Sequence, residues 1–464
     1  MKRSSIIIAA ACMVLGACNK FGDLNVNPNL PSQASNTQLI ANSQLYLPVL
    51  AESPQGIYFG QYLSETQYPN LSLFNQVSAS FYGIYQGPLM NLDSVLRAKV
   101  YNPAEGPGAN QQAVAKILKA YYFWHITDRW GDVPYSAALQ GKNDFTPAYD
   151  TQEQIYNGLF TELAAANDMI VAGNISNDII YKGNITKWKK LGNTIRLLMA
   201  LRLSEVAPEK AKTEFNAALA AGIMTSTADN LTFQHLAEQA NESYWYDQVT
   251  DQNRKWWALS LTLVDKMKPV DDPRLPVYGD KNSDGNYVGL EFGKLDGLST
   301  TAFSLLGAEI RRQDAKVYLV TYAQALFAKA EAAKRGWTSG GEAEAEANYK
   351  AAVRESIYQW TGDSTTYAAF IAKPGIAYVP ASGMEQIATQ RWVHLFMHGY
   401  EAWAEWRRTG FPALHKPQGK DIPTRQGYPS DEVFNNRDNY NEAVTRQFGG
   451  AGDGLYGKLW WDKP

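Results

Sequence analysis

Apolar residues recur along most of the chain with the spacing of amphipathic helices. In residues 111–128, apolar side chains fall on one face of a helix of about 3.6 residues per turn. Residues 181–205 and 313–335 show the same periodicity, and residues 151–154 have the S/T-x-x-E/Q form of a capping box that opens a further helix. The pattern therefore predicts a mainly helical protein.

Some of these helices carry the alanine and aromatic spacing of tetratricopeptide helix pairs. Ala211, Phe215 and Ala218 follow the A-x₃-aromatic-x₂-A pattern, residues 345–352 repeat it, and residues 188–192 match the W-x₂-L-G start. The matches do not recur at a regular interval of about 34 residues. We therefore expect an irregular superhelix of tetratricopeptide-like pairs, with simple amphipathic helices that match by chance as the alternative.

Long segments separate the predicted helices. Loops of this length in a compact protein usually serve a function, so we expect the recognition surface to lie in them. The fold class expected is thus all-α, or mainly α, with helix pairs that carry long irregular loops. The segments are residues 102–110, 228–253, 269–306, 361–382 and 412–464.

The amino terminus has the organisation of a secretory leader. Lys2 and Arg3 precede an apolar run that is too short to span a bilayer of about 30 Å, and Gly16 and Ala17 precede Cys18. A cysteine directly after the leader resembles the bacterial lipobox and predicts acylation of Cys18, which would anchor the chain to a membrane. The alternative is an ordinary secreted protein with an incidental cysteine.

These features predict three segments. Residues 1–17 form a lipoprotein signal peptide, residues 18–36 form a lipidated tether rich in Asn, Pro and Ser, and residues 37–464 form a single helical domain. The other cysteine, Cys12, lies in the leader, so the mature chain is expected to have no disulfide.

Charge and aromatic content restrict the class of ligand. The chain has a formal net charge of −3 without long basic runs, which argues against nucleic acid and anionic membranes as partners. Its 27 Tyr and 13 Trp include many that lie outside helical periodicity. Such rings suit flat amphipathic ligands such as sugars or peptides.

The densest aromatic group predicts the ligand-binding site. Stacking on sugar rings, with hydrogen bonds from intervening amides and carboxylates, would use this mixture of residues. Neighbours on a helix point about 100° apart, so we expect one of Trp256 and Trp257 to belong to the core. A second candidate segment, residues 61–74, contributes Tyr68, although its aromatic residues would equally suit contact with a partner protein. The candidate ligand-binding residues are Tyr244, Trp245, Tyr246, Asn253, Trp256, Trp257 and Tyr68.

One segment matches the full pattern of a calcium loop. Its ligand positions are Asp280, Asn282, Asp284, Asn286 and Glu291. Prolines before the loop and glycines after it do not suit the helices of an EF-hand. We favour an Asn/Asp/Gly turn, with a structural Ca²⁺ that stiffens the loop as the alternative; no cofactor is otherwise expected.

Catalytic motifs are absent from the sequence. There is no G-x-S-x-G elbow, Walker loop or dinucleotide fingerprint. His394 and His398 share the spacing of a zinc-binding helix, but Leu395 stands where the catalytic glutamate would be, so we interpret both histidines as buried or stacking residues. Glycoside hydrolysis needs only two carboxylates, and no pair is singled out, so an enzyme is the weaker interpretation.

Five short motifs follow the leader and Cys18 and are spaced along nearly the whole chain: residues 21–28, 130–135, 272–275, 390–392 and 401–408. Together with the leader they resemble the SusD/RagB family, especially its SusD-like branch. The resemblance implies a non-catalytic, mainly helical lipoprotein at the surface of the outer membrane. It would bind oligosaccharides or peptides and deliver them to a SusC-like TonB-dependent transporter. The alternatives are a surface glycoside hydrolase and a tetratricopeptide-type protein-interaction scaffold.

Overall fold

The computed structural model describes residues 34–75 and 78–462 of the 464-residue chain. The predicted signal peptide and Cys18 lie outside these residues. Helices dominate, as the periodicity predicted, and two short two-stranded sheets accompany them. None of the helices in the described part of the chain combines the length and apolarity that crossing a membrane would need.

The main helices are α2 (Asn36–Gln44), α5 (Met90–Arg97), α6 (Gly108–Trp130), α7 (Gln152–Met169), α8 (Ile185–Arg202), α9 (Pro208–Ala221), α13 (Tyr322–Lys334), α14 (Gly341–Thr361), α16 (Gly383–His394), α17 (Gly399–Thr409) and α19 (Arg437–Phe448). The shorter ones used below are α3 (Pro54–Phe59), α10 (Tyr244–Tyr246), α11 (Leu261–Met267) and α12 (Leu275–Tyr278). The strands are β1 (Leu63–Glu65), β2 (Leu231–Gln234), β3 (Trp257–Leu259) and β4 (Lys316–Val320).

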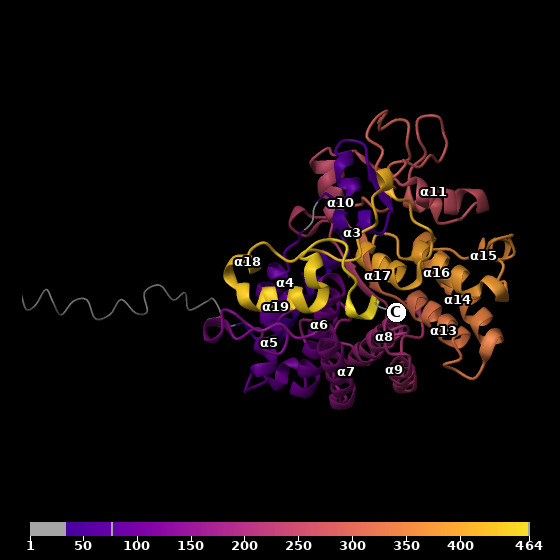
Figure 1. Cartoon of the computed structure of the whole chain (residues 1–464). Helices are drawn as coiled ribbons and strands as arrows, with labels where there is room; N and C mark the ends of the chain where they lie inside the picture. The colour runs from indigo at the N-terminus through magenta and orange to yellow at the C-terminus, as the bar shows by residue number, and fades with distance from the viewer. Residues whose placement is uncertain (1–33, 76–77, 463–464) are drawn as a thin grey trace, which may run out of the picture.

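Consecutive helices pack against each other in pairs, α6 with α7, α8 with α9 and α13 with α14 (Figure 1). The alanine and aromatic positions of the tetratricopeptide pattern lie in the pair contacts. Ala211, Phe215 and Ala218 on α9 are completely buried, as are Ala345, Tyr349 and Ala352 on α14. Small side chains allow close approach of the helices while the aromatic ring fills the gap. The prediction of paired helices is confirmed.

Capping residues explain where several helices begin. Thr151 accepts from the backbone N–H of Gln154, whose side chain returns to the backbone of Thr151, so the predicted capping box is confirmed. Thr321 and Gln324 make the same exchange at the start of α13.

The prediction of one continuous helix over residues 313–335 is wrong. Its first part forms β4, which pairs antiparallel with β2 so that Val317 lies opposite Phe233. Lys316–Val320 is rich in β-branched and aromatic residues, and a short apolar run does not by its period distinguish a strand from a helix. Thr321 then caps α13, which ends the strand.

A loop-rich region containing α3, α10 and α11 lies above the helix pairs in Figure 1. Its core is a separate cluster of buried residues that includes Trp245, Trp257, Trp392 and Trp403. It joins the helical part where α3 crosses α17. There a Cβ atom on Gly399 would lie 2.2 Å from the carbonyl carbon of Gly56, so only glycine permits this contact.

Replacement of Phe215 by Ala is expected to lower the free energy of unfolding by about 3–5 kcal/mol, because it leaves a cavity between α8 and α9. Denaturant unfolding measures the change. Phe145→Ala is the control, since Phe145 is 78% exposed and its loss should change stability by no more than about 0.5 kcal/mol. Equal effects of the two variants would contradict the assigned packing.

Candidate ligand-binding site

The structure brings together the two aromatic segments that the sequence analysis selected separately. β1 pairs antiparallel with β3, placing Glu65 opposite Trp257. Beyond the ladder, the Trp256 carbonyl accepts hydrogen bonds from the backbone N–H of Thr66 at 3.0 Å and from its hydroxyl at 2.9 Å. The rings of Tyr68 and Trp256 meet edge to face with centroids 5.2 Å apart. Tyr68 is 52% exposed and Trp256 is half-buried, so the pair faces solvent on a stiff backbone.

Trp257, which follows Trp256 in the sequence, and Trp245 both point into the core. Trp257 is 5% exposed and its indole N–H donates to the Tyr58 hydroxyl at 2.9 Å. Trp245 is 2% exposed and packs edge to face on Trp257 at 5.4 Å. Successive side chains of a strand face opposite sides, which explains why one of Trp256 and Trp257 is core, as expected. The prediction that Trp245 and Trp257 contact the ligand is therefore corrected, because both side chains are buried and neither ring has a free face on which a ligand could stack.

Polar groups surround the exposed pair. The Arg254 guanidinium lies 5.8 Å from the centre of the Trp256 ring and donates to the Gln248 side-chain oxygen at 2.5 Å. Asn253 is exposed in a left-handed backbone conformation, and Tyr244 and Tyr246 are half-buried nearby in sequence. Donors and acceptors beside aromatic faces can bind hydroxylated rings without any bond-breaking chemistry.

Glu65 lies beneath this surface and was not singled out by any sequence motif. Its carboxyl group accepts a hydrogen bond from Tyr58, while its Oε2 is buried without a partner among the described residues. Burial raises the pKa of Glu65 to about 7, although the hydrogen bond from Tyr58 opposes the shift. The carboxyl group thus carries a proton under mildly acidic conditions.

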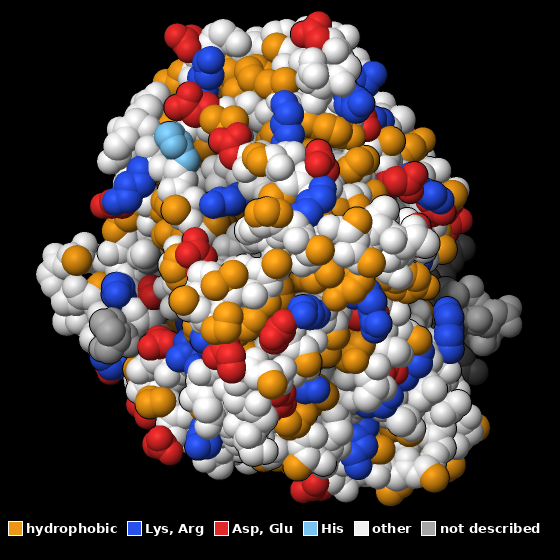
Figure 2. All heavy atoms as spheres, turned by 90° about the vertical axis from the view of Figure 1, so that its right-hand side faces the viewer, with side chains coloured by type: hydrophobic (Ala, Val, Ile, Leu, Met, Phe, Trp, Pro, Cys, Tyr) orange, Lys and Arg blue, Asp and Glu red, His pale blue; other side chains and the backbone are white. Residues whose placement is uncertain are grey.

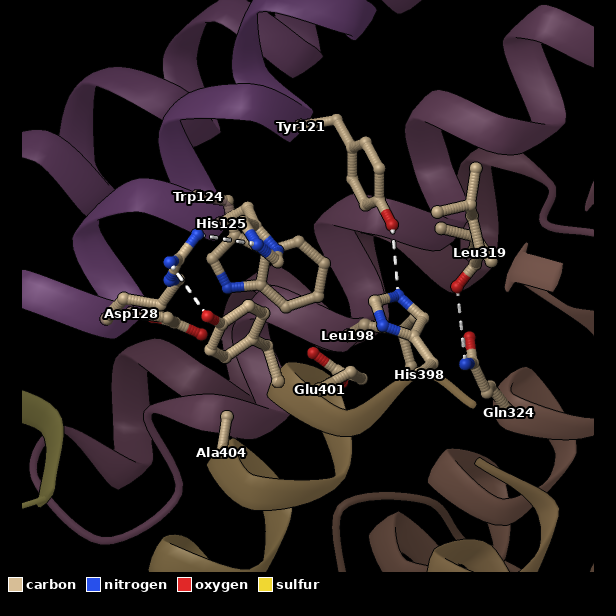
Figure 3. A pocket seen from close by; sticks show the side chains of 13 residues that line it. Tyr121, Trp124, His125, Asp128, Leu198, Leu319, Gln324, His398, Glu401 and Ala404 are labelled. Carbon is tan, nitrogen blue, oxygen red and sulfur yellow. Dashed lines mark hydrogen bonds between the residues drawn. The ribbon is translucent and has the colours of Figure 1, made fainter. Parts of the chain in front are cut away.

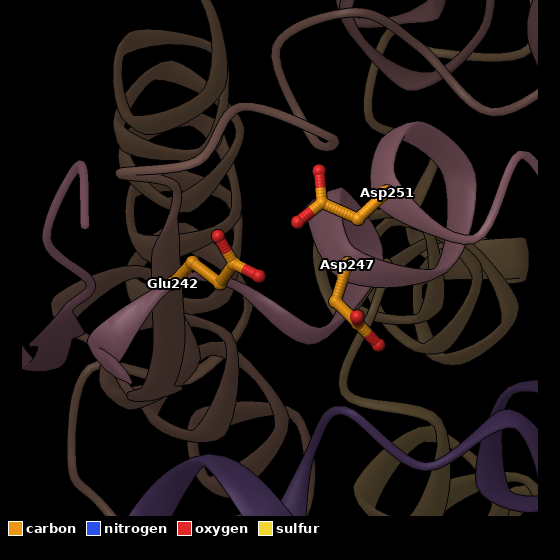
Figure 4. A group of neighbouring side chains, drawn as sticks. All are labelled: Glu242, Asp247 and Asp251. Carbon is orange, nitrogen blue, oxygen red and sulfur yellow. The ribbon is translucent and has the colours of Figure 1, made fainter. Parts of the chain in front are cut away.

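Three carboxylates near this surface face one another (Figure 4). One ligand oxygen each from Glu242, Asp247 and Asp251 lies within 4.8 Å of the others, so the group could hold an ion. Glu242 and Asp251 lie at either end of α10 and the turn that follows it, and no sequence spacing typical of a metal site links them. Within residues 34–75 and 78–462, this is the one group of three or more His, Cys, Asp or Glu side chains whose ligand atoms lie close enough to hold a metal ion.

The segment that matches a calcium loop forms a tight turn. The Asn282 side-chain oxygen accepts from the backbone N–H groups of Asp284 at 3.1 Å and Asn286 at 2.9 Å. Asp280 pairs with Arg311. Glu291 faces His415 at 3.6 Å, and within the described part of the chain the carboxylates of Asp280, Asp284 and Glu291 are not grouped within 4.8 Å of one another. The structure contains the Asn/Asp/Gly turn that the sequence analysis favoured, and Ca²⁺ binding by this segment stays a prediction.

The charged residues of the carboxy-terminal motif are buried between helices. On α17, Glu405 lies 2.5 Å from Arg202, 2.9 Å from Arg391 and 2.7 Å from Arg408. Burial would raise the pKa of Glu405, but the three guanidinium groups hold it well below its usual range. This network is structural, because its groups are inaccessible and paired.

A small cavity of ≈ 20 Å³ adjoins the network, and its lining includes Tyr121, His125, Arg129, His398 and Glu401 beside several apolar residues (Figure 3). Arg129 bonds His125 at 3.4 Å, and Tyr121 bonds His398 at 3.3 Å. The cavity is too small for a saccharide, so it is not the ligand site.

The two histidines of the zinc-like spacing are buried, as interpreted from the sequence. His394 ends α16 and His398 precedes α17, so they do not share the one helix that was expected. His394 bonds Thr321 at 2.7 Å and Ser356 at 3.0 Å. Burial lowers the pKa of each histidine to about 3, which keeps both neutral.

Comparisons with known proteins agree on one family. A family profile described as "Starch-binding associating with outer membrane", of the SusD-like type, matches residues 28–429. A solved structure of a chitin-binding protein is 30% identical, with a TM-score of 0.81 over 93% of this chain and 100% of that one. A SusD homologue of Bacteroides fragilis is 27% identical, with a TM-score of 0.80 and the same coverage.

A chitin-binding SusD homologue of Flavobacterium johnsoniae has the same fold, with a TM-score of 0.77 at 24% identity over 92% of this chain and 98% of that one. Among curated proteins the comparison found no match.

The raised pKa of Glu65 predicts a dependence of stability on pH. Between pH 4.5 and about 7 the folded state keeps a proton that the unfolded state releases. The free energy of unfolding should therefore fall as pH rises through this window, by about 1–3 kcal/mol from this group. Urea titrations of the wild type and of Glu65→Gln at several pH values isolate the contribution. Equal slopes for the two proteins would mean that Glu65 is ionised in the fold.

Proposed function

The chain belongs to the SusD-like family, whose members are non-enzymatic nutrient-binding proteins of the outer membrane, and on this basis we propose that it binds an oligosaccharide at the Tyr68–Trp256 surface. It delivers the ligand to a SusC-like TonB-dependent transporter. The single observation that carries the site is the exposed aromatic pair held between two loop segments by the Thr66 hydrogen bonds.

The chemistry of this surface supports a saccharide ligand. Two rings that are already fixed lose little side-chain freedom on binding, which favours stacking on the apolar face of a sugar. Arg254 and Asn253 supply hydrogen bonds to hydroxyl groups around the rings, and Gln248 holds the Arg254 guanidinium in place. The nearest buried acid, Glu65, lies beneath the pair and bonds Tyr58, so it does not face a second carboxylate across a bound sugar.

The first ligand to test is an oligomer of N-acetylglucosamine, because a 30% identical structure is that of a chitin-binding protein. Peptides are the alternative class, and a panel that contains both distinguishes them. The exposed amide group of Asn253 suits the acetamido group of such a sugar, which carries one donor and one acceptor.

We further propose that Cys18 is acylated after removal of residues 1–17, that residues 18–36 form a tether, and that residues 37–464 act as one domain at the cell surface. The face seen in Figure 2 would suit a broad contact of mixed polarity with a transporter, because acidic and basic side chains lie between patches of hydrophobic ones.

Trp256→Ala and Tyr68→Ala are each expected to weaken binding of the oligosaccharide at least about fivefold, because each removes a stacking face. Isothermal titration calorimetry of the chain beginning after Cys18 measures the affinity, and circular dichroism checks that the helices remain. Tyr456→Ala is the matched control, since Tyr456 is 56% exposed and Tyr68 52%. Unchanged affinity in both site variants would exclude this surface.

Cys18→Ala should release the protein from the membrane fraction, because stable anchoring depends on the acyl chains. Labelling with a radioactive fatty acid and fractionation of cells test this. Cys12→Ala should keep both the label and the membrane association, since Cys12 lies within the leader. Retention of the Cys18 variant in the membrane with no label would contradict the lipid anchor.

A further inference from the structure

A second hollow, with a volume of ≈ 270 Å³, opens where the β2–β4 ribbon meets the end of α14. Its lining includes Gln234, Glu309, Arg312, Asp314, Tyr318 and Trp360. None of its residues belongs to the Tyr68–Trp256 surface. We propose that this hollow is a second saccharide subsite, which binds one ring of a neutral glycan; its ligand class rests on the proposed function.

Two aromatic side chains form a fixed wall of the hollow. The rings of Tyr318 and Trp360 meet edge to face with centroids 5.2 Å apart, and Trp360 also packs on Tyr278 at 5.0 Å. The Trp360 indole N–H donates to the His394 carbonyl at 3.1 Å. The Tyr318 hydroxyl donates to the Gln359 carbonyl at 3.3 Å. Both rings are half-buried, so each is held in place and still presents part of its surface.

Charged groups on the rim compensate one another. Arg312 donates from Nε and from one terminal nitrogen to the two oxygens of Asp314, both at 3.0 Å, and from the other terminal nitrogen to Glu309 at 3.4 Å. Lys316 adds a positive charge, so the four rim groups sum to zero. An ionic ligand would gain no net attraction here and would compete with the existing pairs.

A neutral hydroxylated ring suits both features. The carboxylates of Glu309 and Asp314 keep free lone pairs that can accept hydroxyl protons while they remain paired with Arg312. The aromatic wall offers an apolar face for the C–H groups of the ring. The volume of the hollow lies just below the range of roughly 300–1,000 Å³ for small-molecule pockets. The hollow can therefore hold one sugar ring but not a longer stretch of glycan.

The first test is calorimetry with N-acetylglucosamine oligomers on the mature chain and on Trp256→Ala. The wild type should show two classes of site, and Trp256→Ala should keep one of them. Adding Arg312→Ala should weaken the remaining class about tenfold, because the fork that orients both carboxylates is lost. Arg354→Ala is the matched control, since its side chain is 54% exposed and ion-paired, against 55% for Arg312, and it lies outside the hollow.

A photo-crosslinking N-acetylglucosamine trimer, added to the Trp256→Ala variant, provides an independent measurement. Crosslinked peptides that contain residues 309–318 or 359–360 would support the subsite. Loss of all binding in Trp256→Ala would overturn the second subsite and leave the proposed function intact. If Trp256→Ala leaves the affinity unchanged and Arg312→Ala abolishes binding, the result would support the subsite in the hollow and overturn the Tyr68–Trp256 site. Failure of the wild type to bind any glycan would overturn both.

Discussion

The buried ion-pair network on α17 is the constraint on which the rest of the structure depends. Arg202 of α8, Arg391 of α16 and Arg408 of α17 have almost no exposed side-chain surface, and all three contact Glu405. Removing such charges from water costs several kcal/mol per group, and only complete pairing offsets this cost. The arrangement is therefore stable only when α8, α16 and α17 meet in one register. Glu331 of α13 extends the constraint to a fourth helix through Arg408.

The position of the Tyr68–Trp256 surface follows from that register. Directly before the network residues of α17, Gly399 allows α3 to approach at backbone contact distance. The chain continues from α3 through Tyr62, whose hydroxyl donates to the Trp392 carbonyl of α16, into β1. β1 then pairs with β3 and sets the Tyr68–Trp256 pair at the surface. A loop site thus gains rigidity from a helical scaffold, which suits a protein that binds and releases a ligand unchanged.

The ionisable groups divide into those that support the fold and those that face solvent. Glu405, Arg202 and the two buried histidines are enclosed and paired, so they are not available for proton transfer to a ligand. The carboxylates at the surface, including those of Figure 4 and of the second hollow, are exposed or half-exposed and suit hydrogen bonding or ion binding. This division agrees with a capture protein of the non-enzymatic SusD-like family, because the two carboxylates of the second hollow are bound to one guanidinium group, that of Arg312.

The sequence by itself determined the helix pairs, the capping box at Thr151 and the family resemblance, because these depend on local periodicity and on short motifs. It also selected both segments that meet at the Tyr68–Trp256 surface, and it predicted that one of Trp256 and Trp257 is buried. It could not distinguish β4 from a helix, since the partner strand β2 lies far away in the chain. Only the tertiary structure decided that Trp245 and Trp257 point inward, that Glu65 lies beneath the exposed rings, and that Arg312 and Trp360 share a hollow. Each of these features depends on contacts between residues that are distant in sequence, and such contacts cannot be predicted from local sequence patterns.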